Sequence, residues 1–381
     1  MQFRSDFRDT DRMNRLLGLL ARRVHPDRTY RIMEFCGGHT HALCSSGLID
    51  RLPKQILMVH GPGCPVCVLP TGRLQQAMDL ALSKPVILAT YGDMLRVPGR
   101  GQHNLVWARS MGADVRVVYS VEDALELARR QPQRQVVFLA VGFETTTPMT
   151  AAAVAAAARE ALGNFTVLCN HVLTPPSLHA LLADEKDRAR IDGFVGPGHV
   201  STIIGSAAFW PICERYKKPI AISGFEPVDL VSAIWNLVEQ LNAGECVVHN
   251  GFPRAVSAGG NVAAQQQMAQ VFAVTPTFAW RGLGQIAHSA LKLRDEFADF
   301  DAERRFDLPS LTFEDHKACR CSEVLRGLCL PTDCSLFGTA CTEDTPLGSC
   351  MVSSEGACAA YTQLGRPPKR RPLPTLNGPN P

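Results

Sequence analysis

The sequence has little charge imbalance and no long apolar segment. Its 39 lysines and arginines against 36 aspartates and glutamates give a net charge of only +3, and no basic patch carries interleaved aromatic residues. This argues against a nucleic-acid partner. The longest apolar runs fall far short of the ~20 residues of a membrane span. The first residues are charged and include no apolar signal-peptide core, so we expect a cytoplasmic protein without membrane association.

Cysteine, by contrast, is abundant. Fourteen cysteines in a chain expected in the cytoplasm indicate reduced thiols, metal ligands or redox groups rather than a disulfide framework. Half of them lie in one C-terminal segment: Cys319, Cys321, Cys329, Cys334, Cys341, Cys350 and Cys358. Because this segment is short of apolar residues, it has little to bury. Thiolate coordination of a metal or cluster can supply the free energy that orders it.

The spacing of these cysteines favours a four-iron four-sulfur cluster over zinc. Four thiolates suit either centre, but paired C-x-x-C knuckles are missing, and the first pair, Cys319 and Cys321, is C-x-C. Such a pair suggests that one sulfur binds a cluster while its neighbour stays free for disulfide chemistry. A structural zinc site and unliganded buried thiols are the alternatives.

Hydrophobic patterning predicts an α/β protein. At 381 residues the chain exceeds the size at which single cores stop growing, so we expect two or three domains. An amphipathic helix is expected over residues 11–24, with Asp11 as its N-cap. Short apolar runs at residues 31–35, 55–59 and 85–90 then precede glycine-bearing turns. Their alternation with helical stretches indicates a parallel sheet with crossover helices.

The same alternation continues and suggests two similar, Rossmann-like α/β units. Further strands are expected at residues 115–119, 136–141, 166–169, 193–195 and 219–223, and helices at 149–162 and 227–241. Two weak echoes, V-H-G-P-G-C with V-G-P-G-H and V-G-F-E with S-G-F-E, support two units. The strand pattern fades after Gly251. We therefore predict α/β domains at 28–130 and 131–250, a third, helical or irregular cluster-bearing domain from 1–27 and 251–364, and a disordered tail at 365–381.

Thiols also follow two predicted strands of the first unit. C-G-G-H-T-H begins at Cys36, and G-P-G-C-P-V-C contains Cys64 and Cys67. Because ligands gather where parallel strands end, these thiols can face one soft metal. C-P-V-C alone also has the spacing of a thioredoxin-like redox pair, or of two core cysteines. We expect His39 to support the site through hydrogen bonding rather than to bind the metal.

Two carboxylates end predicted strands. Asp93 in Y-G-D and Glu144 in G-F-E-T-T are candidate acids or bases, or caps of the following helices or turns. Other thiols and one histidine stand apart from a second thiol motif, and we expect structural roles for His41, Cys44, Cys169, Cys213, Cys246 and Cys329.

The set of motifs, in this order, resembles the HypD family of hydrogenase maturation proteins. The resemblance covers nearly the whole chain: C-G-G-H-T-H, G-P-G-C-P-V-C, T-Y-G-D-M-L-R-V-P-G, G-F-E-T-T, N-H-V-L-T-P-P, G-P-G-H-V-S-T-I-I-G, G-F-E-P and M-V-S-S-E-G-A-C. Cys44, Cys329 and the tail after Tyr361 lie outside the family pattern. The family helps to build the Fe(CN)2CO part of the nickel-iron hydrogenase centre. Its fold has two α/β domains and a third domain that bears a cluster.

This resemblance implies a role for each group of residues. The iron that carries cyanide and carbon monoxide would be held by Cys36, Cys64 and Cys67, with His39 in support. Asp93, singled out above by its place at a strand end, is a further supporting candidate. The four-iron four-sulfur cluster would be bound by Cys319, Cys334, Cys341 and Cys358. Cys321 and Cys350 would form a redox dithiol beside the cluster, as in ferredoxin:thioredoxin reductase. Glu355 matches an acidic position of the family.

The resemblance also implies partners. A small HypC-type protein would form a stable complex and add an N-terminal cysteine thiolate to the iron, and a HypE-type protein would deliver cyanide transiently from a C-terminal thiocyanate. The hydrogenase large-subunit precursor would be reached through the HypC-type partner. The protein would then be a redox-active scaffold more than a turnover enzyme. Competing hypotheses are a freestanding cluster-dependent dithiol oxidoreductase and a zinc-stabilised binding module.

Overall fold

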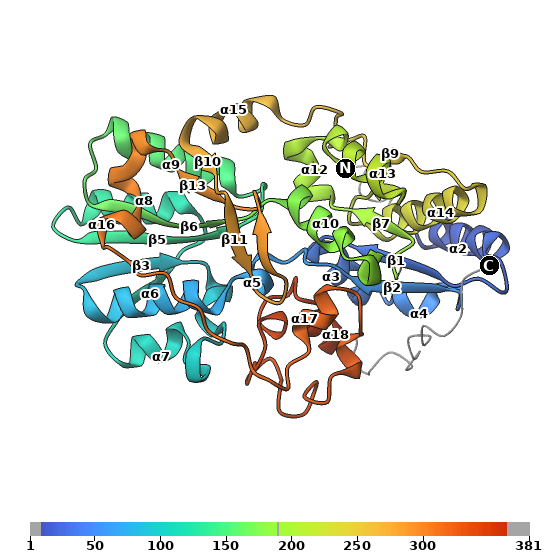
Figure 1. The fold of residues 1–381 in the computed structure, drawn as a ribbon, viewed down its shortest axis with the longest axis horizontal. Helices are drawn as coiled ribbons and strands as arrows, with labels where there is room; N and C mark the ends of the chain where they lie inside the picture. Colours follow the sequence, from blue (N-terminus) through green and yellow to red (C-terminus); the bar gives the residue numbers. More distant parts are fainter. Residues whose placement is uncertain (1–8, 189, 364–381) are drawn as a thin grey trace.

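The computed structural model describes residues 9–188 and 190–363 as two lobes, each built on a parallel β-sheet (Figure 1). The five-stranded sheet has the order β2 (Ile56–His60), β1 (Tyr30–Glu34), β7 (Gly193–Gly196), β8 (Ile220–Ile222) and β9 (Val248–Asn250). The four-stranded sheet has the order β4 (Asp114–Val117), β3 (Val86–Thr90), β5 (Gln135–Gly142) and β6 (Phe165–His171). The predicted α/β class with parallel sheets is therefore confirmed.

Helices surround both sheets, as buried parallel strands require. The helices of the N-terminal half are α2 (Thr10–Arg23), α3 (Gly37–Ser45), α4 (Leu48–Arg51), α5 (Pro65–Val68), α6 (Thr71–Ser83), α7 (Leu105–Ser110), α8 (Val121–Arg130), α9 (Thr147–Arg159), α10 (Thr174–Ala183) and α11 (Glu185–Arg188). Those that follow are α12 (Gly198–Ile204), α13 (Trp210–Tyr216), α14 (Pro227–Ala243), α15 (Val262–Val271), α16 (Ala302–Arg305), α17 (Cys321–Leu325) and α18 (Ala357–Thr362). Short 3-10 helices are η1 (Gly92–Arg96), η2 (Arg100–Gln102), η3 (Ser206–Phe209), η4 (Asp295–Phe300), η5 (Pro331–Asp333) and η6 (Ser349–Met351). None of the helices in the described residues is long and apolar enough to cross a bilayer.

Sheet membership does not follow the order of the chain. The chain leaves the five-stranded sheet after β2, forms the whole four-stranded sheet, and returns at β7. The predicted boundary after residue 130 therefore separates β3 and β4 from β5 and β6, with which they share a sheet. Hydrophobic runs identify strands but do not say which strands pair, because pairing is set by contacts distant in sequence. The similar motifs V-H-G-P-G-C and V-G-P-G-H begin at the ends of β2 and β7, respectively. These two strands are the neighbours of β1 in the sheet.

Local capping explains where several helices begin and end. The N-cap of α2 is Asp9, not the predicted Asp11, because an Asp9 carboxylate oxygen accepts from the backbone N–H groups of Asp11 at 2.8 Å and Arg12 at 3.0 Å. Helix α14, expected at 227–241, continues to Ala243 and ends at Gly244 in the left-handed conformation with φ of 69°. That conformation suits glycine at a helix end.

The C-G-G-H-T-H motif forms the first turns of α3 rather than the predicted turn, with Cys36 as the N-cap. Its two glycines permit close packing. A Cβ atom on Gly37 would lie 2.4 Å from the Cβ atom of Glu355, and one on Gly38 would lie 2.8 Å from the Phe225 ring. The start of α3 is therefore pressed against both the C-terminal segment and the loop after β8.

Strands also form after Gly251, where the sequence was expected to become helical or irregular. Two antiparallel pairs follow, formed by β10 (Phe272–Val274) with β13 (Leu291–Leu293) and by β11 (Thr277–Trp280) with β12 (Gly284–Ala287). These strands are three or four residues long, too short for a clear period-two pattern. The predicted disordered tail at 365–381 lies outside the described residues.

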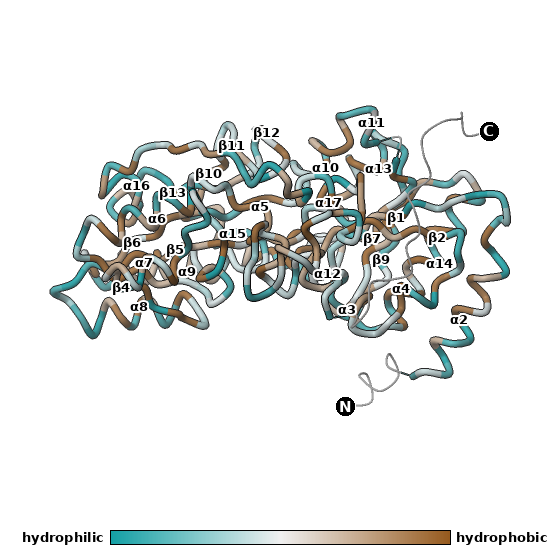
Figure 2. The backbone as a smooth tube through the Cα atoms, turned by 90° about the horizontal axis from the view of Figure 1, so that it is seen from below, coloured by the Kyte–Doolittle hydropathy of each residue, from teal (hydrophilic) through white to brown (hydrophobic). Residues whose placement is uncertain are grey.

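The largest hydrophobic core joins the two lobes and the C-terminal segment. It includes Val59 of β2, Leu88 of β3, Phe194 of β7 and Met351 of η6. Figure 2 shows hydrophobic segments inside both lobes and hydrophilic ones at the outer loops. In Figure 1 the C-terminal segment with α17 and α18 lies beneath the junction of the lobes. This core places the carboxyl ends of strands from both sheets next to the cysteine-rich segment.

Candidate functional site

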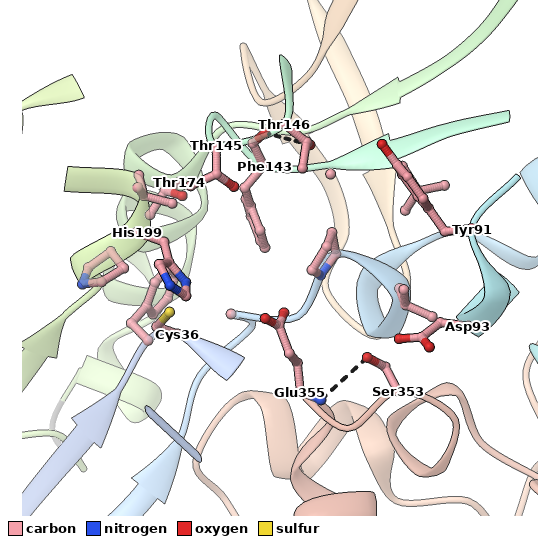
Figure 3. A pocket seen from close by; sticks show the side chains of 18 of the residues that line it. Cys36, Tyr91, Asp93, Phe143, Thr145, Thr146, Thr174, His199, Ser353 and Glu355 are labelled. Carbon is pink, nitrogen blue, oxygen red and sulfur yellow. Dashed lines mark hydrogen bonds between the residues drawn. The ribbon is translucent and has the colours of Figure 1, made fainter. Parts of the chain in front are cut away.

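A cleft of about 350 Å³ lies between the lobes, where loops from both sheets meet (Figure 3). The loops after β1, β2, β3, β5 and β7 line it, and residues 353–355 of the C-terminal segment close one side. These loops follow the carboxyl ends of parallel strands, the position at which α/β proteins bind ligands. Its walls include apolar side chains such as Phe35, Val141 and Phe143.

Cys36 presents its thiol to this cleft. The residue is 6% exposed, and its backbone N–H donates to a Glu34 carboxylate oxygen at 3.0 Å. Burial, followed by the nearby carboxylates of Glu355 and Glu34, raises the pKa of the Cys36 thiol to about 12. A metal ion that binds this sulfur must therefore displace a proton from it.

Cys64 and Cys67 lie behind the wall of the cleft and are joined by a disulfide bond. Their neighbours Gly63, Pro65 and Val66 line the cleft, whereas the two cysteines do not. The Cys64 loop touches the Cys36 loop, because the N–H of Gly37 donates to the carbonyl of Gly63 at 3.1 Å. Both sulfurs become available to a metal only after two-electron reduction of this bond.

Two carboxylates also face the cleft. Asp93 in η1 and Glu355 of the C-terminal segment both line it, with Asp93 on the side opposite Cys36 and Glu355 between them (Figure 3). Burial raises the pKa of Glu355, and the charges of Asp93 and Glu34 add to this effect. The structure thus brings three of the predicted site residues, Cys36, Asp93 and Glu355, into one cavity.

His39 does not line the cleft. It is fully buried in α3, where a ring nitrogen donates to the carbonyl of Ser223 at 3.1 Å. Burial lowers the pKa of His39 to about 4, so the ring is neutral at physiological pH. This contact ties α3 to the loop after β8, which agrees with a supporting position for the side chain.

It was not predicted from the sequence that a different histidine, His199, would line the cleft. His199, in the first turn of α12, lines the cleft, and its ring stacks on Phe225 with 3.8 Å between centroids. The similarity of two motifs could have identified His199. G-P-G-H at the end of β7 resembles G-P-G-C after β2, and His199 occupies the position in the first motif that Cys64 occupies in the second.

Glu144 does not line the cleft, and it caps α10 rather than α9, the helix that follows it directly in the sequence. Its carboxylate accepts from the backbone N–H of Thr174 at 2.8 Å and from the Thr174 hydroxyl at 2.9 Å, at the first residue of α10. Burial raises the pKa of this carboxyl to about 7. The carboxylate holds the chain where it returns from the four-stranded sheet.

A separate cavity in the C-terminal segment is lined by five thiols. They are the four expected cluster ligands and one member of the expected dithiol: Cys319, Cys334, Cys341, Cys358 and Cys321. Apolar side chains such as Phe337 and Met351 complete the lining. A Cβ atom on Gly348 would lie 2.5 Å from the Cys319 sulfur and 2.6 Å from the Cys321 sulfur. This set of soft donors, with a glycine that leaves the sulfurs room, fits an iron–sulfur cluster.

Cys350 lies behind that cavity and does not line it. It is fully buried, and hydrogen bonds from the thiols of Cys321 and Cys358 lower its pKa to about 6. The neighbouring Ser349 hydroxyl donates to the carbonyl of Cys67 at 2.8 Å. The cysteine-rich C-terminal segment is thus in direct contact with the C-P-V-C motif.

The cysteines expected to be structural differ among themselves. The sulfurs of Cys213 and Cys246 lie 2.8 Å apart, so these two are a pair and not isolated. Cys44, Cys169 and Cys329 are buried, as expected of structural residues. Across residues 9–188 and 190–363, no three His, Cys, Asp or Glu side chains are grouped closely enough to hold one metal ion.

Comparison with known proteins gives a consistent result. Residues 11–365 match the family described as "HypD: Hydrogenase formation hypA family". The chain is 53% identical over 369 residues to "Hydrogenase maturation factor HypD" of Azotobacter vinelandii, which covers 96% of this chain and 97% of the relative. It is 50% identical over 370 residues to the HypD of Cupriavidus necator, covering 96% and 98%. With the HypD of Escherichia coli it shares 44% identity over 369 residues, covering 95% and 98%.

Proposed function

Because the chain belongs to the HypD family of hydrogenase maturation factors, we propose that it is the scaffold on which the Fe(CN)2CO group of a nickel-iron hydrogenase is assembled. A HypC-type partner binds stably and shares the iron through its N-terminal cysteine thiolate. A HypE-type donor brings cyanide, and the finished group reaches the hydrogenase large-subunit precursor through the HypC-type partner. This work takes place in the cytoplasm.

The observation that carries this proposal is the position of Cys36 in the cleft between the lobes. Cyanide and carbon monoxide favour low-spin ferrous iron, and a soft thiolate can hold such iron while leaving positions open for them. The cleft of about 350 Å³ offers room for the iron, its small ligands and the end of a partner chain. Glu355, which lies between Cys36 and Asp93, supplies a carboxylate that accepts the proton released when Cys36 binds the iron.

Cys64 and Cys67 join the iron site after reduction. Two electrons and two protons convert their disulfide into two thiols, which lose the protons again on binding iron. The hydrogen bond between Gly37 and Gly63 keeps their loop against Cys36. The disulfide thus separates a resting form from one that can take up iron.

The reducing electrons come from the C-terminal segment. Cys319, Cys334, Cys341 and Cys358 hold a four-iron four-sulfur cluster, which supplies single electrons when bound. The dithiol of Cys321 and Cys350 passes on two. By thiol–disulfide exchange it is oxidised to a disulfide as the bond between Cys64 and Cys67 is reduced, with two protons transferred. The contact between Ser349 and Cys67 supports a short route between the two pairs.

The test is Cys36→Ser. Serine replaces a soft thiolate by a hard, largely protonated hydroxyl of similar size, so the protein should fold but lose iron that carries cyanide and carbon monoxide. The complex with the HypC-type partner should show no cyanide or carbonyl infrared bands. Hydrogenase activity in a strain carrying only this variant should fall by at least about tenfold, the effect expected of ~1.4 kcal/mol or more of lost metal binding.

The matched control is Cys169→Ser, a buried cysteine of β6 whose sulfur donates to the carbonyl of Leu291 at 3.3 Å. Serine can keep that bond, and the infrared bands should remain. Wild-type bands in Cys36→Ser would remove Cys36 from the iron site.

A second candidate function is a freestanding dithiol oxidoreductase. The disulfide between Cys64 and Cys67, in contact with the cluster segment, favours it. Such an enzyme would reduce an external protein disulfide without a HypC-type partner, and its complexes would carry no cyanide or carbonyl bands. Infrared spectra of the purified wild-type complex therefore separate the two functions.

A further inference from the structure

A buried polar network lies directly behind Cys36, and no local sequence pattern marks its members. Glu34 is 1% exposed at the carboxyl end of β1, where it is in register with His60 of β2. One carboxylate oxygen of Glu34 accepts from the Cys36 N–H at 3.0 Å. The other accepts from the Nδ1–H of His60 at 2.7 Å and from the Thr40 hydroxyl. The carboxylate therefore holds both the start and the first turn of α3.

The network continues into the C-terminal segment. The Nε2 atom of His60 is 2.9 Å from the hydroxyl of Tyr361, and the two rings meet edge to face with centroids 5.1 Å apart. Tyr361 belongs to α18, which also carries Cys358, and it packs against Cys44 of α3. An unbroken chain of hydrogen bonds thus runs from the Cys36 backbone to the helix of the cysteine-rich segment.

Folding stability alone does not explain this buried network. A carboxylate removed from water is destabilising unless its oxygens are hydrogen-bonded, and Glu34 engages three donors to meet this need. Apolar side chains of similar volume often stabilise such a position equally well or better. The network therefore needs a reason beyond packing. Its two ends, the Cys36 loop and α18, provide one.

We propose that Glu34, His60 and Tyr361 are positioning residues that fix the Cys36 thiol in the cleft and make its position depend on an ordered C-terminal segment. This inference rests on the proposed function for the meaning of the Cys36 position. When α18 is in place, Tyr361 orients His60, His60 orients the Glu34 carboxylate, and Glu34 holds the backbone of Cys36. An iron-binding thiol would then be presented only by a chain whose cysteine-rich segment is folded.

Tyr361→Phe removes one hydroxyl at the far end of the network from Cys36. The matched control is Tyr30→Phe, which removes a fully buried hydroxyl at the opposite end of β1, where it is bonded to Asn242 and to the His25 N–H. In the reduced protein without a partner, the rate at which iodoacetamide alkylates Cys36 should rise about fivefold in Tyr361→Phe, the factor for one lost hydrogen bond. Tyr30→Phe should leave this rate unchanged, although it removes two hydrogen bonds and should cost at least as much stability as Tyr361→Phe.

A second readout uses the complex with the HypC-type partner. Glu34→Gln keeps the side-chain volume but places an amide N–H₂ group among three donors, so the Cys36 backbone loses its partner or shifts. Both Glu34→Gln and Tyr361→Phe should shift the cyanide and carbonyl bands or reduce the iron that carries them, with the cluster absorbance retained. If Glu34→Gln does not fold, Tyr361→Phe and its control Tyr30→Phe still test the positioning role of the network.

The outcomes separate this inference from the proposed function. Equal Cys36 alkylation rates in wild type, Tyr361→Phe and Tyr30→Phe would overturn the positioning role. So would equal increases in the two tyrosine variants, which would show general loosening. If wild-type complexes carry no infrared bands, the proposed function fails, yet the alkylation rates still test the network. Faster alkylation in Tyr361→Phe alone supports it.

Discussion

At the scale of single residues, the two cysteines of C-R-C share a cavity but have different neighbours. Both sulfurs lie against Gly348, yet only Cys321 is also hydrogen-bonded to the buried Cys350. If Cys319 binds the cluster and Cys321 belongs to the dithiol, iodoacetamide should alkylate Cys321 after mild reduction of the intact holoprotein and leave Cys319 protected, because only a thiol free of iron reacts.

The chain makes this measurement direct. Trypsin cleaves after Arg320, which separates the two cysteines into different peptides for mass spectrometry. Protein unfolded without its metal should label both and serves as the control. Equal protection of Cys319 and Cys321 in the holoprotein would mean that the division of the pair is wrong.

Single residues also show which parts of the candidate site the sequence reveals. Cys36 stands out because a thiol follows an apolar run and precedes two glycines. Glu34 and His60 were missed because each looks like the last residue of a strand, and only the register of β1 and β2 makes them neighbours. Tyr361 is 301 positions from His60 in the sequence, so no local pattern connects them.

At the scale of elements, the strands were predictable and their partners were not. β1, β2 and β3 fall within a residue of the apolar runs at 31–35, 55–59 and 85–90. The turn predicted at Gly37 and Gly38 was wrong, because glycine is common in turns but also occurs in a helix that packs closely on a neighbour. The order of the sheets depends on the crossovers after β2 and β6, which no local signal marks.

One contact between elements has a defined pH dependence. Glu144 at the end of β5 holds the start of α10, and burial raises the pKa of its carboxyl to about 7. Because this pKa is raised on folding, the folded protein binds the proton more tightly than the unfolded chain does. Ionisation of Glu144 therefore lowers the free energy of unfolding as the pH rises from about 4.5 to about 7.

Glu144→Gln should abolish this pH-dependent decrease in the free energy of unfolding, because the amide cannot ionise. The amide oxygen can still accept from the Thr174 N–H. Relative to wild type, the variant should gain on the order of 2 kcal/mol in free energy of unfolding between about pH 5 and about pH 7.5, measured by urea denaturation. His39 and His171, whose pKa values burial lowers to about 4, act in both proteins and cancel in the difference. A difference independent of pH would contradict a buried, ionising Glu144.

At the scale of the whole molecule, the two lobes and the cysteine-rich segment differ in what holds them together. Each lobe has a core of buried aliphatic and aromatic side chains on its sheet. The segment contributes Leu325, Cys341, Cys350, Met351, Val352 and Cys358 to the shared core, and Val324, Cys329 and Ala357 form a further small core. Between residues 317 and 347, Leu325 and Cys341 are the contributions to the buried part of the shared core, so we expect metal binding by the thiols to add to the order of this stretch.

If this segment holds the proposed cluster, loss of the cluster should unfold residues 317–347 and leave the lobes intact. Anaerobically purified protein should be brown and contain iron and inorganic sulfide, and oxygen should bleach it. After bleaching, or in Cys334→Ala and Cys341→Ala, trypsin should cleave at Lys317, Arg320 and Arg326 at least about tenfold faster, because opening there costs little free energy without the metal. A large N-terminal fragment with both sheets should persist. A protein that contains one zinc ion and no sulfide would contradict a cluster that organises this segment, and so would equal protease resistance with and without the metal. In either case Tyr361, the end of the Glu34 network, would be ordered by packing alone.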